Sequence, residues 1–122
     1  MGKFEYKITD ENINDILVTA IEGGINYWCG KVEVKGNDYK GAKYASDAVS
    51  AGAVIILHDA EGIEDSVEID KVKIVEAVER YIQENGTGIV DLDSGEIDCG
   101  QVDAEVADVI IQLAAFGEVV YG

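Results

Sequence analysis

The first quarter of the chain carries the clearest helical pattern of apolar residues. Either Thr9 or Asp10 is a suitable N-cap, and the glycine pair Gly23-Gly24 follows as a stop signal. The pattern therefore predicts an amphipathic helix over residues 10–22. Between these limits, apolar side chains recur at the spacing of one helix face: Ile13, Ile16, Leu17, Ala20 and Ile21.

Three more helices are predicted, over residues 46–52, 70–86 and 103–116. Asp70 and Asp103 stand at the N-cap positions of the two longer helices, where a carboxylate accepts a hydrogen bond from a free backbone amide. The last helix is expected to turn an apolar stripe inward, formed by Val106, Val109, Ile110 and Leu113.

Short strands are expected between these helices. Apolar and polar residues alternate over 3–8 and 31–35, which is typical of half-buried strands. The apolar run 53–57 predicts a buried strand, and a turn joins it to a second strand at 66–69 as a hairpin. Further short strands are predicted at three places: 88–91, 96–99 and 119–121.

Together these elements predict an α+β fold with a mainly antiparallel sheet of short strands and three to four helices packed on it. At 122 residues the chain is expected to form one domain over 1–122, large enough to bury a core without disulfides or metals. Its 48% hydrophobic residues, against 28% charged residues, favour a folded chain over a disordered one.

Charge is distributed unevenly along the chain. The first 44 residues hold six lysines and seven acidic residues, whereas the last 42 hold nine acidic residues and no Lys or Arg. The net charge of −16 repels nucleic acid and anionic membranes and attracts basic protein surfaces. We therefore expect a basic protein as the partner, with no direct nucleic-acid or membrane contact.

Cysteine usage and hydropathy predict a cytoplasmic protein. The N-terminal residues alternate like a strand and lack the apolar core of a secretory signal. The two cysteines, Cys29 and Cys99, are then expected to remain reduced. No apolar run approaches the roughly 20 residues needed to span a bilayer.

Catalytic and metal-binding motifs match poorly. His58 is the only histidine, and its place at the end of a buried strand favours a structural role over a catalytic dyad with Cys29 or Cys99. The acidic stretch from Asp91 resembles the start of a calcium loop, but Val102 stands where the bidentate glutamate is required, so a solvated turn is favoured. We expect no enzymatic activity, no cofactor and no metal.

Two groups of residues are candidates for binding a ligand or partner. Tyr27 and Trp28 follow the glycine pair and could form an aromatic wall for a ring-bearing ligand, although core packing is the more common role of such residues. Glu105, Asp108 and Gln112 share one face of the last predicted helix, beside its apolar stripe. That face is either solvated or supplies hydrogen bonds to a ligand or partner.

Two segments carry a resemblance to a known group of proteins. Residues 22–29 (EGGINYWC) and 103–122 (DAEVADVIIQLAAFGEVVYG) resemble small proteins of undefined activity that are encoded in phages and prophages of Gram-positive bacteria. The resemblance extends over nearly the whole chain and includes Ile69-Asp70-Lys71. It implies an accessory protein that acts in the bacterial host, where such proteins often counter host defences, and it transfers no catalytic residue.

Three functions follow from these observations. The favoured one is a non-enzymatic inhibitor that binds a basic, nucleic-acid-handling host protein through its acidic surface. The second is an oligomeric protein that sequesters a nucleotide-like ligand near Tyr27 and Trp28, and the third is an enzyme, for which no nucleophile–base pair is found. A homodimer fits either binding function, through a C-terminal apolar patch of Phe116, Val119, Val120 and Tyr121.

Overall fold

The structure is a computed structural model that describes residues 7–59 and 66–121 of the chain. Helices and strands are interspersed along it, in an α+β arrangement, as predicted. The elements are α1 (Asp10–Thr19), the π-helix η1 (Ala20–Gly24), β1 (Cys29–Val34), the 3-10 helix η2 (Lys35–Asn37), α2 (Ala45–Ser50), β2 (Ile55–Asp59), β3 (Val67–Ile69), α3 (Lys71–Asn85), β4 (Val90–Asp91), β5 (Glu96–Ile97), the 3-10 helix η3 (Cys99–Gln101) and α4 (Ala104–Phe116).

Strands β1, β2 and β3 form an antiparallel sheet in that order, which confirms the predicted hairpin between the second and third. Ile55 lies in the centre of the inward face, where it pairs with Val34 of β1 and Ile69 of β3. All three side chains are buried. Because successive residues of a strand point to opposite faces, Glu33 and His58 lie on the outward face.

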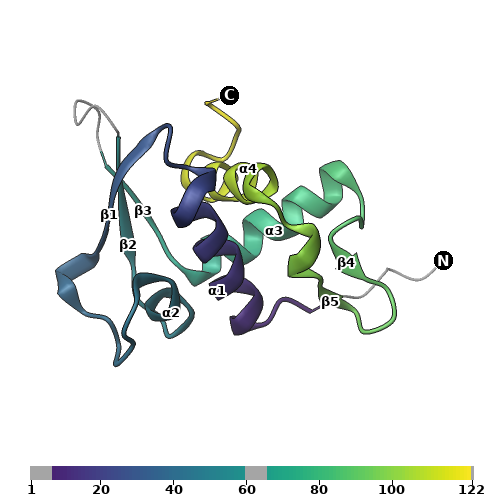
Figure 1. Cartoon of the computed structure of the whole chain (residues 1–122), viewed down its shortest axis with the longest axis horizontal. Helices are drawn as coiled ribbons and strands as arrows, with labels where there is room; N and C mark the ends of the chain where they lie inside the picture. The colour runs from purple at the N-terminus through teal and green to yellow at the C-terminus, as the bar shows by residue number, and fades with distance from the viewer. Residues whose placement is uncertain (1–6, 60–65, 122) are drawn as a thin grey trace.

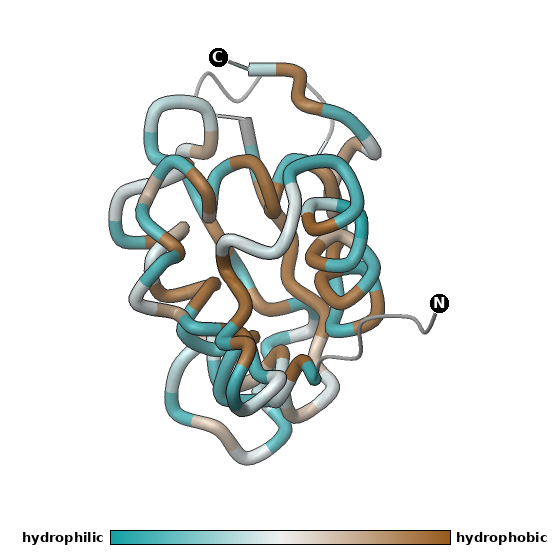
Figure 2. Tube along the Cα trace, turned by 90° about the vertical axis from the view of Figure 1, so that its right-hand side faces the viewer, coloured by the Kyte–Doolittle hydropathy of each residue, from teal (hydrophilic) through white to brown (hydrophobic). Residues whose placement is uncertain are grey.

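Helices α1, α3 and α4 pack together between two β-structures (Figure 1). The three-stranded sheet lies at one end of the molecule, and the β4–β5 hairpin lies at the other. The apolar stretches of the trace run mainly through its inner strands and helix turns, and hydrophilic stretches lie mostly outside (Figure 2). The largest fully buried apolar side chains are Ile13, Ile16, Leu17, Ile25, Ile55, Ile69, Ile74, Ile110, Ile111, Val49 and Val78.

Side-chain caps fix the starts of α1, α3 and α4. Thr9 caps α1: its hydroxyl accepts a hydrogen bond from the Asn12 amide, while the Asn12 side chain accepts one from the Thr9 amide. Asp70 and Asp103 cap α3 and α4, as predicted. Among the described residues, no helix combines the length and apolar composition needed to cross a membrane.

The strand predictions at the two ends of the chain have different outcomes. The strand predicted over 3–8 lies mostly outside the described residues, and its remaining part contributes a single parallel bridge from Lys7 to Glu96. The strand predicted at 119–121 is wrong: this segment is irregular. Its amides bond to the side chain of Gln112 and not to a neighbouring strand.

Candidate functional site

The candidate site begins at the π-helix η1, which the sequence analysis did not predict. In a π-helix each backbone hydrogen bond spans one residue more than in an α-helix. Here the Ile25 amide donates to the Ala20 carbonyl at 3.0 Å. A Cβ atom at Gly24 would lie only 2.6 Å from the Ala104 carbonyl oxygen, so glycine permits η1 to approach the first turn of α4. Gly24 thus serves the packing of η1 against α4.

Asp108 of α4 joins this segment to the helix. Its carboxylate accepts hydrogen bonds from the Tyr27 hydroxyl at 2.5 Å and from the Trp28 indole N–H at 2.8 Å. The Gln112 amide donates a third bond at 2.9 Å. Asp108 is only 8% exposed, so these charge-assisted bonds replace the water that the carboxylate gives up on folding.

Gln112 is the second polar hub, and it is fully buried. Its Oε1 atom accepts bonds from the Val120 and Tyr121 amides at 2.7 and 2.8 Å. Its Nε2 atom donates to Asp108 and to the Tyr121 carbonyl, the latter at 3.1 Å. One side chain therefore holds the segment that follows α4 against the helix.

An aromatic cluster lies beside these hubs. Trp28 is 5% exposed, and its ring stacks on Tyr121 with 5.2 Å between centroids and 3° between planes. Phe116 meets both rings in tilted arrangements, at 5.4 and 5.9 Å. Such stacked and tilted pairs add to the stability gained by burying the rings. Trp28 is thus a core residue, the more common of the two roles considered for it.

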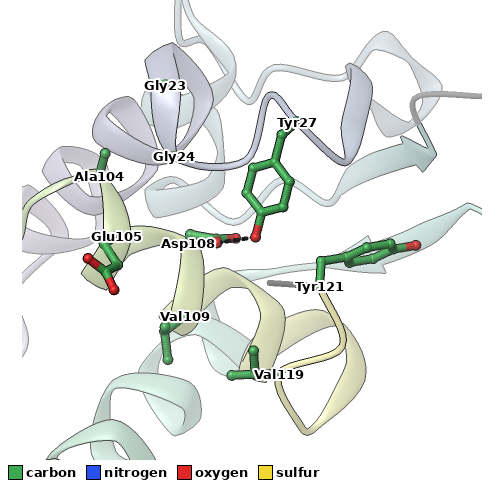
Figure 3. A pocket seen from close by; sticks show the side chains of 9 residues that line it. All are labelled: Gly23, Gly24, Tyr27, Ala104, Glu105, Asp108, Val109, Val119 and Tyr121. Atoms are coloured by element: carbon green, nitrogen blue, oxygen red, sulfur yellow. Dashed lines mark hydrogen bonds between the residues drawn. The ribbon is translucent and has the colours of Figure 1, made fainter.

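Between η1, α4 and the C-terminal segment lies an open groove of about 530 Å³ (Figure 3). Tyr27 reaches across it toward Asp108, and Glu105 stands at its margin (Figure 3). The Tyr27 ring remains 55% exposed even though its hydroxyl is bonded. The groove is lined by Gly23, Gly24, Tyr27, Ala104, Glu105, Asp108, Val109, Val119 and Tyr121.

The Tyr27 hydroxyl is held in its neutral form. Desolvation by burial, followed by the hydrogen bond to the Asp108 carboxylate, raises the pKa of Tyr27 to about 12. At neutral pH the phenol therefore acts as a donor to Asp108. The groove presents the exposed ring, not the hydroxyl, to an incoming group.

The structure brings together four of the five predicted binding residues. Tyr27, Trp28, Asp108 and Gln112 form one hydrogen-bonded group, whereas Glu105 lies exposed at the rim. The interpretation of Asp108 and Gln112 as part of a solvated helix face is wrong, since both are buried. A direct contact of these five residues with a ligand or partner stays a prediction.

The inward stripe predicted for the last helix is partly wrong. Ile110 and Leu113 are buried as expected, but Val106 and Val109 are only half-buried. The buried face of α4 is rotated relative to the prediction, because Asp108 and Gln112 turn toward the residues that they bond, 27–28 and 120–121. The buried residues of α4 are Ala107, Asp108, Ile110, Ile111, Gln112 and Leu113.

Sequence reasoning did not assign Val109 and Tyr121 to this site. Tyr121 is an aromatic residue just beyond a predicted helix end, which could have indicated a role in the site. The sequence analysis assigned it only to a patch for homodimer formation. Of that patch, Val119 and Val120 are 49% and 55% exposed, whereas Phe116 and Tyr121 pack on Trp28. The homodimer itself stays a prediction.

The remaining candidate groups lie elsewhere. His58 bonds Glu33 at 2.7 Å on the outer face of the sheet. Both cysteines are free. Burial raises the pKa of Cys29 and, together with the negative charge of Asp15, raises that of Cys99 to about 11. Protonated thiols are poor nucleophiles at neutral pH.

The acidic stretch considered for calcium forms the turn between β4 and β5. Asp91 and Asp93 are exposed there, and the Asp91 carboxylate accepts a bond from the Asp93 amide at 3.0 Å. This agrees with a solvated turn. Within residues 7–59 and 66–121, no group of three or more His, Cys, Asp or Glu side chains is placed to hold a metal ion.

Comparison of the chain with protein-family models, with curated proteins and with solved structures finds no significant match.

Proposed function

We propose that the chain is a non-enzymatic binding protein whose groove beside α4 holds a basic segment of a partner protein. The composition of the groove carries this proposal. Tyr27, Val109 and Val119 supply apolar surface, Glu105 and Asp108 supply carboxyl groups, and none of its described lining residues is Lys or Arg. An apolar floor with an acidic margin suits a segment that combines an apolar side chain with cationic neighbours.

The charge of the whole chain supports a protein partner over a nucleic acid. A net charge of −16 repels phosphates at long range and accelerates encounter with a basic surface. Among the described residues that line the groove, Glu105 is the exposed acidic one, and the Asp108 carboxylate already accepts three internal bonds. Glu105 is therefore the residue that we expect to meet a partner's Lys or Arg.

The resemblance to phage-encoded proteins supports a counter-defence role in the cytoplasm of a bacterial host. Proteins that handle nucleic acids carry basic surfaces to bind phosphates. A protein that covers such a surface blocks the nucleic acid from it. We propose that the chain inhibits a host protein in this way.

Affinity capture from host lysate with matched charge variants tests the proposal. We expect the wild-type chain to retain a basic nucleic-acid-handling protein at about 50 mM salt and to lose it at about 500 mM. Glu105→Lys should weaken retention strongly. Glu79→Lys, at an exposed position of α3, makes the same change in net charge outside the groove and should weaken retention less. Equal retention of the host protein by the two variants would contradict the groove as the binding site. Retention that does not depend on salt would contradict attraction between opposite charges as its cause.

A second candidate is the sequestration of a small ring-bearing ligand. The groove volume of about 530 Å³ falls within the range of small-molecule sites, and the exposed Tyr27 ring offers a stacking face. Titration with mononucleotides and dinucleotides should then change the fluorescence of Trp28, which lies next to Tyr27. A flat response to every ligand rejects this candidate and leaves the first one unaffected.

A further inference from the structure

Residues 119–121, which we call the strap, are bound to the molecule as a peptide ligand would be. The Val120 and Tyr121 amides and the Tyr121 carbonyl all bond to the Gln112 side chain. The Tyr121 ring stacks on Trp28. Backbone bonds from one side and a pocket for one side chain are the usual means by which proteins recognise extended peptides.

The strap has few other attachments. Val119 and Val120 leave about half of their surface exposed. Across residues 7–59 and 66–121, no strap amide bonds to a backbone carbonyl. Gly117, with φ of +77°, ends α4 just before the strap, and the Arg80 guanidinium of α3 donates to its carbonyl, so the attachment of the chain to α3 ends one residue before Glu118. The strap therefore depends on Gln112 and on the Tyr121 ring.

Lifting the strap would leave a site with defined chemistry. The Gln112 Oε1 atom would then be an unpaired acceptor at a buried position, where unpaired polar groups are costly, while its Nε2 atom keeps the Asp108 carboxylate and the Tyr27 hydroxyl as partners. Trp28 and Phe116 would offer aromatic surface beside it. An occupant must therefore supply backbone N–H groups together with an aromatic ring, as the strap does.

The strap offers no charge to this site, since Val119, Val120 and Tyr121 are neutral. It runs beside the groove that contains Glu105 and Asp108. The neutral strap gains nothing from these carboxyl groups, whereas Lys or Arg at the same places would be attracted. A basic segment with an aromatic residue would bind more favourably than the resident strap.

We propose that the strap occupies a peptide-recognition site on α4 and Trp28, and that an extended, basic segment of the partner bearing one aromatic residue displaces it. The basic character rests on the proposed function; the site itself rests on the contacts of Gln112 and Trp28. A tethered occupant competes at high effective concentration and lowers the apparent affinity for a free peptide. Weakening the strap must therefore raise that affinity.

The test uses the full chain and an acetylated, amidated peptide of sequence Lys-Val-Val-Tyr-Lys. Binding is followed by the fluorescence of Trp28 and by the NMR signals of the Gln112 side-chain amide. We expect Tyr121→Ala, which removes the competing ring, to bind this peptide at least about tenfold more tightly than the wild type. Tyr44→Ala, which removes an exposed ring outside the groove and the strap, is the matched control and should bind as the wild type does.

Two results would overturn the strap site. One is equal affinity of the wild type and Tyr121→Ala for the peptide. The other is undiminished binding of Lys-Val-Val-Ala-Lys, which lacks the ring. A third peptide, Glu-Val-Val-Tyr-Glu, addresses the charge: if it binds Tyr121→Ala as tightly as the lysine peptide does, the basic partner is contradicted and the strap site stands.

Hydrogen exchange in the wild type gives an independent result should Tyr121→Ala not fold. A peptide that displaces the strap removes the Gln112 acceptor from the Val120 and Tyr121 amides. We therefore expect saturating Lys-Val-Val-Tyr-Lys to accelerate exchange at these two amides while the amides of α4 stay protected. Unchanged exchange at saturation contradicts displacement.

Discussion

The outer face of the three-stranded sheet and the groove beside α4 differ in how far their charged side chains are exposed to solvent. At the sheet, Lys35, directly after β1, and Glu68 of β3 pair at 3.0 Å while about half of each side chain stays exposed. At the groove, the Asp108 carboxylate is buried and is bonded by Tyr27, Trp28 and Gln112, the first two from a segment 80 residues away in sequence. The charged side chains at the sheet stay solvated, whereas the Asp108 carboxylate at the groove is largely shielded from water.

This difference locates the polar residues on which the fold depends. An exposed ion pair loses little when it is broken, because water replaces the partner. A buried polar group that loses its partner keeps its desolvation cost without compensation. We therefore expect substitutions to separate the two regions clearly, with large effects confined to the groove.

The largest expected effect is that of Gln112→Ala. It leaves the Val120 and Tyr121 amides and the Asp108 carboxylate short of partners around a new cavity. We expect the free energy of unfolding to fall by about 3 kcal/mol in urea titrations. Gln83→Ala, at an exposed position of α3, is the control and should change it by less than about 0.5 kcal/mol. Similar losses in both would show that Gln112 is not a hub.

The sequence predicted those parts of the fold that depend on local patterns. Apolar periodicity located α1, α3 and α4, alternation located β1, and an apolar run followed by a turn located the hairpin of β2 and β3. Asp70 and Asp103 were recognised as caps because a cap acts within three residues of its own position. Each of these features is determined by neighbours in the sequence.

The site was predicted only as a set of residues. Tyr27 and Asp108 were both candidates, but nothing in the sequence pairs two positions 81 residues apart. Gln112 was misread because polarity at a helix position normally indicates solvent, and only its partners at 120 and 121 explain its burial. The π-helix η1 was missed because its wide turn is set by packing against α4 and not by an apolar period.

The adjacent glycines of η1 give the second prediction. Gly24→Ala places a methyl group 2.6 Å from the Ala104 carbonyl oxygen, which forces η1 and α4 apart. We expect a loss of about 2 kcal/mol in the free energy of unfolding. Gly23→Ala adds the same methyl group where no other group of the described residues lies within 4 Å, and it should leave stability unchanged or slightly raised. Equal effects of the two would contradict the close approach of η1 to α4.

The third prediction concerns the Tyr27 hydroxyl. Tyr27→Phe removes one bond to Asp108 and keeps the ring, and we expect a loss of about 1 kcal/mol at neutral pH. Since folding raises the pKa of Tyr27 from 10.0 to about 12, the stability it contributes is fully present below pH 10 and is lost as the pH rises through 12. The difference between wild type and variant should therefore shrink across this interval in urea titrations. If the stability difference between wild type and Tyr27→Phe stays constant over this pH interval, the raised pKa of Tyr27 is contradicted.

The smallest effect is expected at the sheet. Lys35→Ala removes the cation that pairs with Glu68, but both side chains are already about half exposed. We expect a change of less than about 0.5 kcal/mol that disappears at high salt, because mobile ions screen an exposed pair. The Gln112→Ala loss should persist at the same salt, since its unpaired groups are buried. A Lys35→Ala effect as large and as salt-resistant as that of Gln112→Ala would mean that the outer face of the sheet also depends on single polar contacts, and the contrast between the two regions would fail.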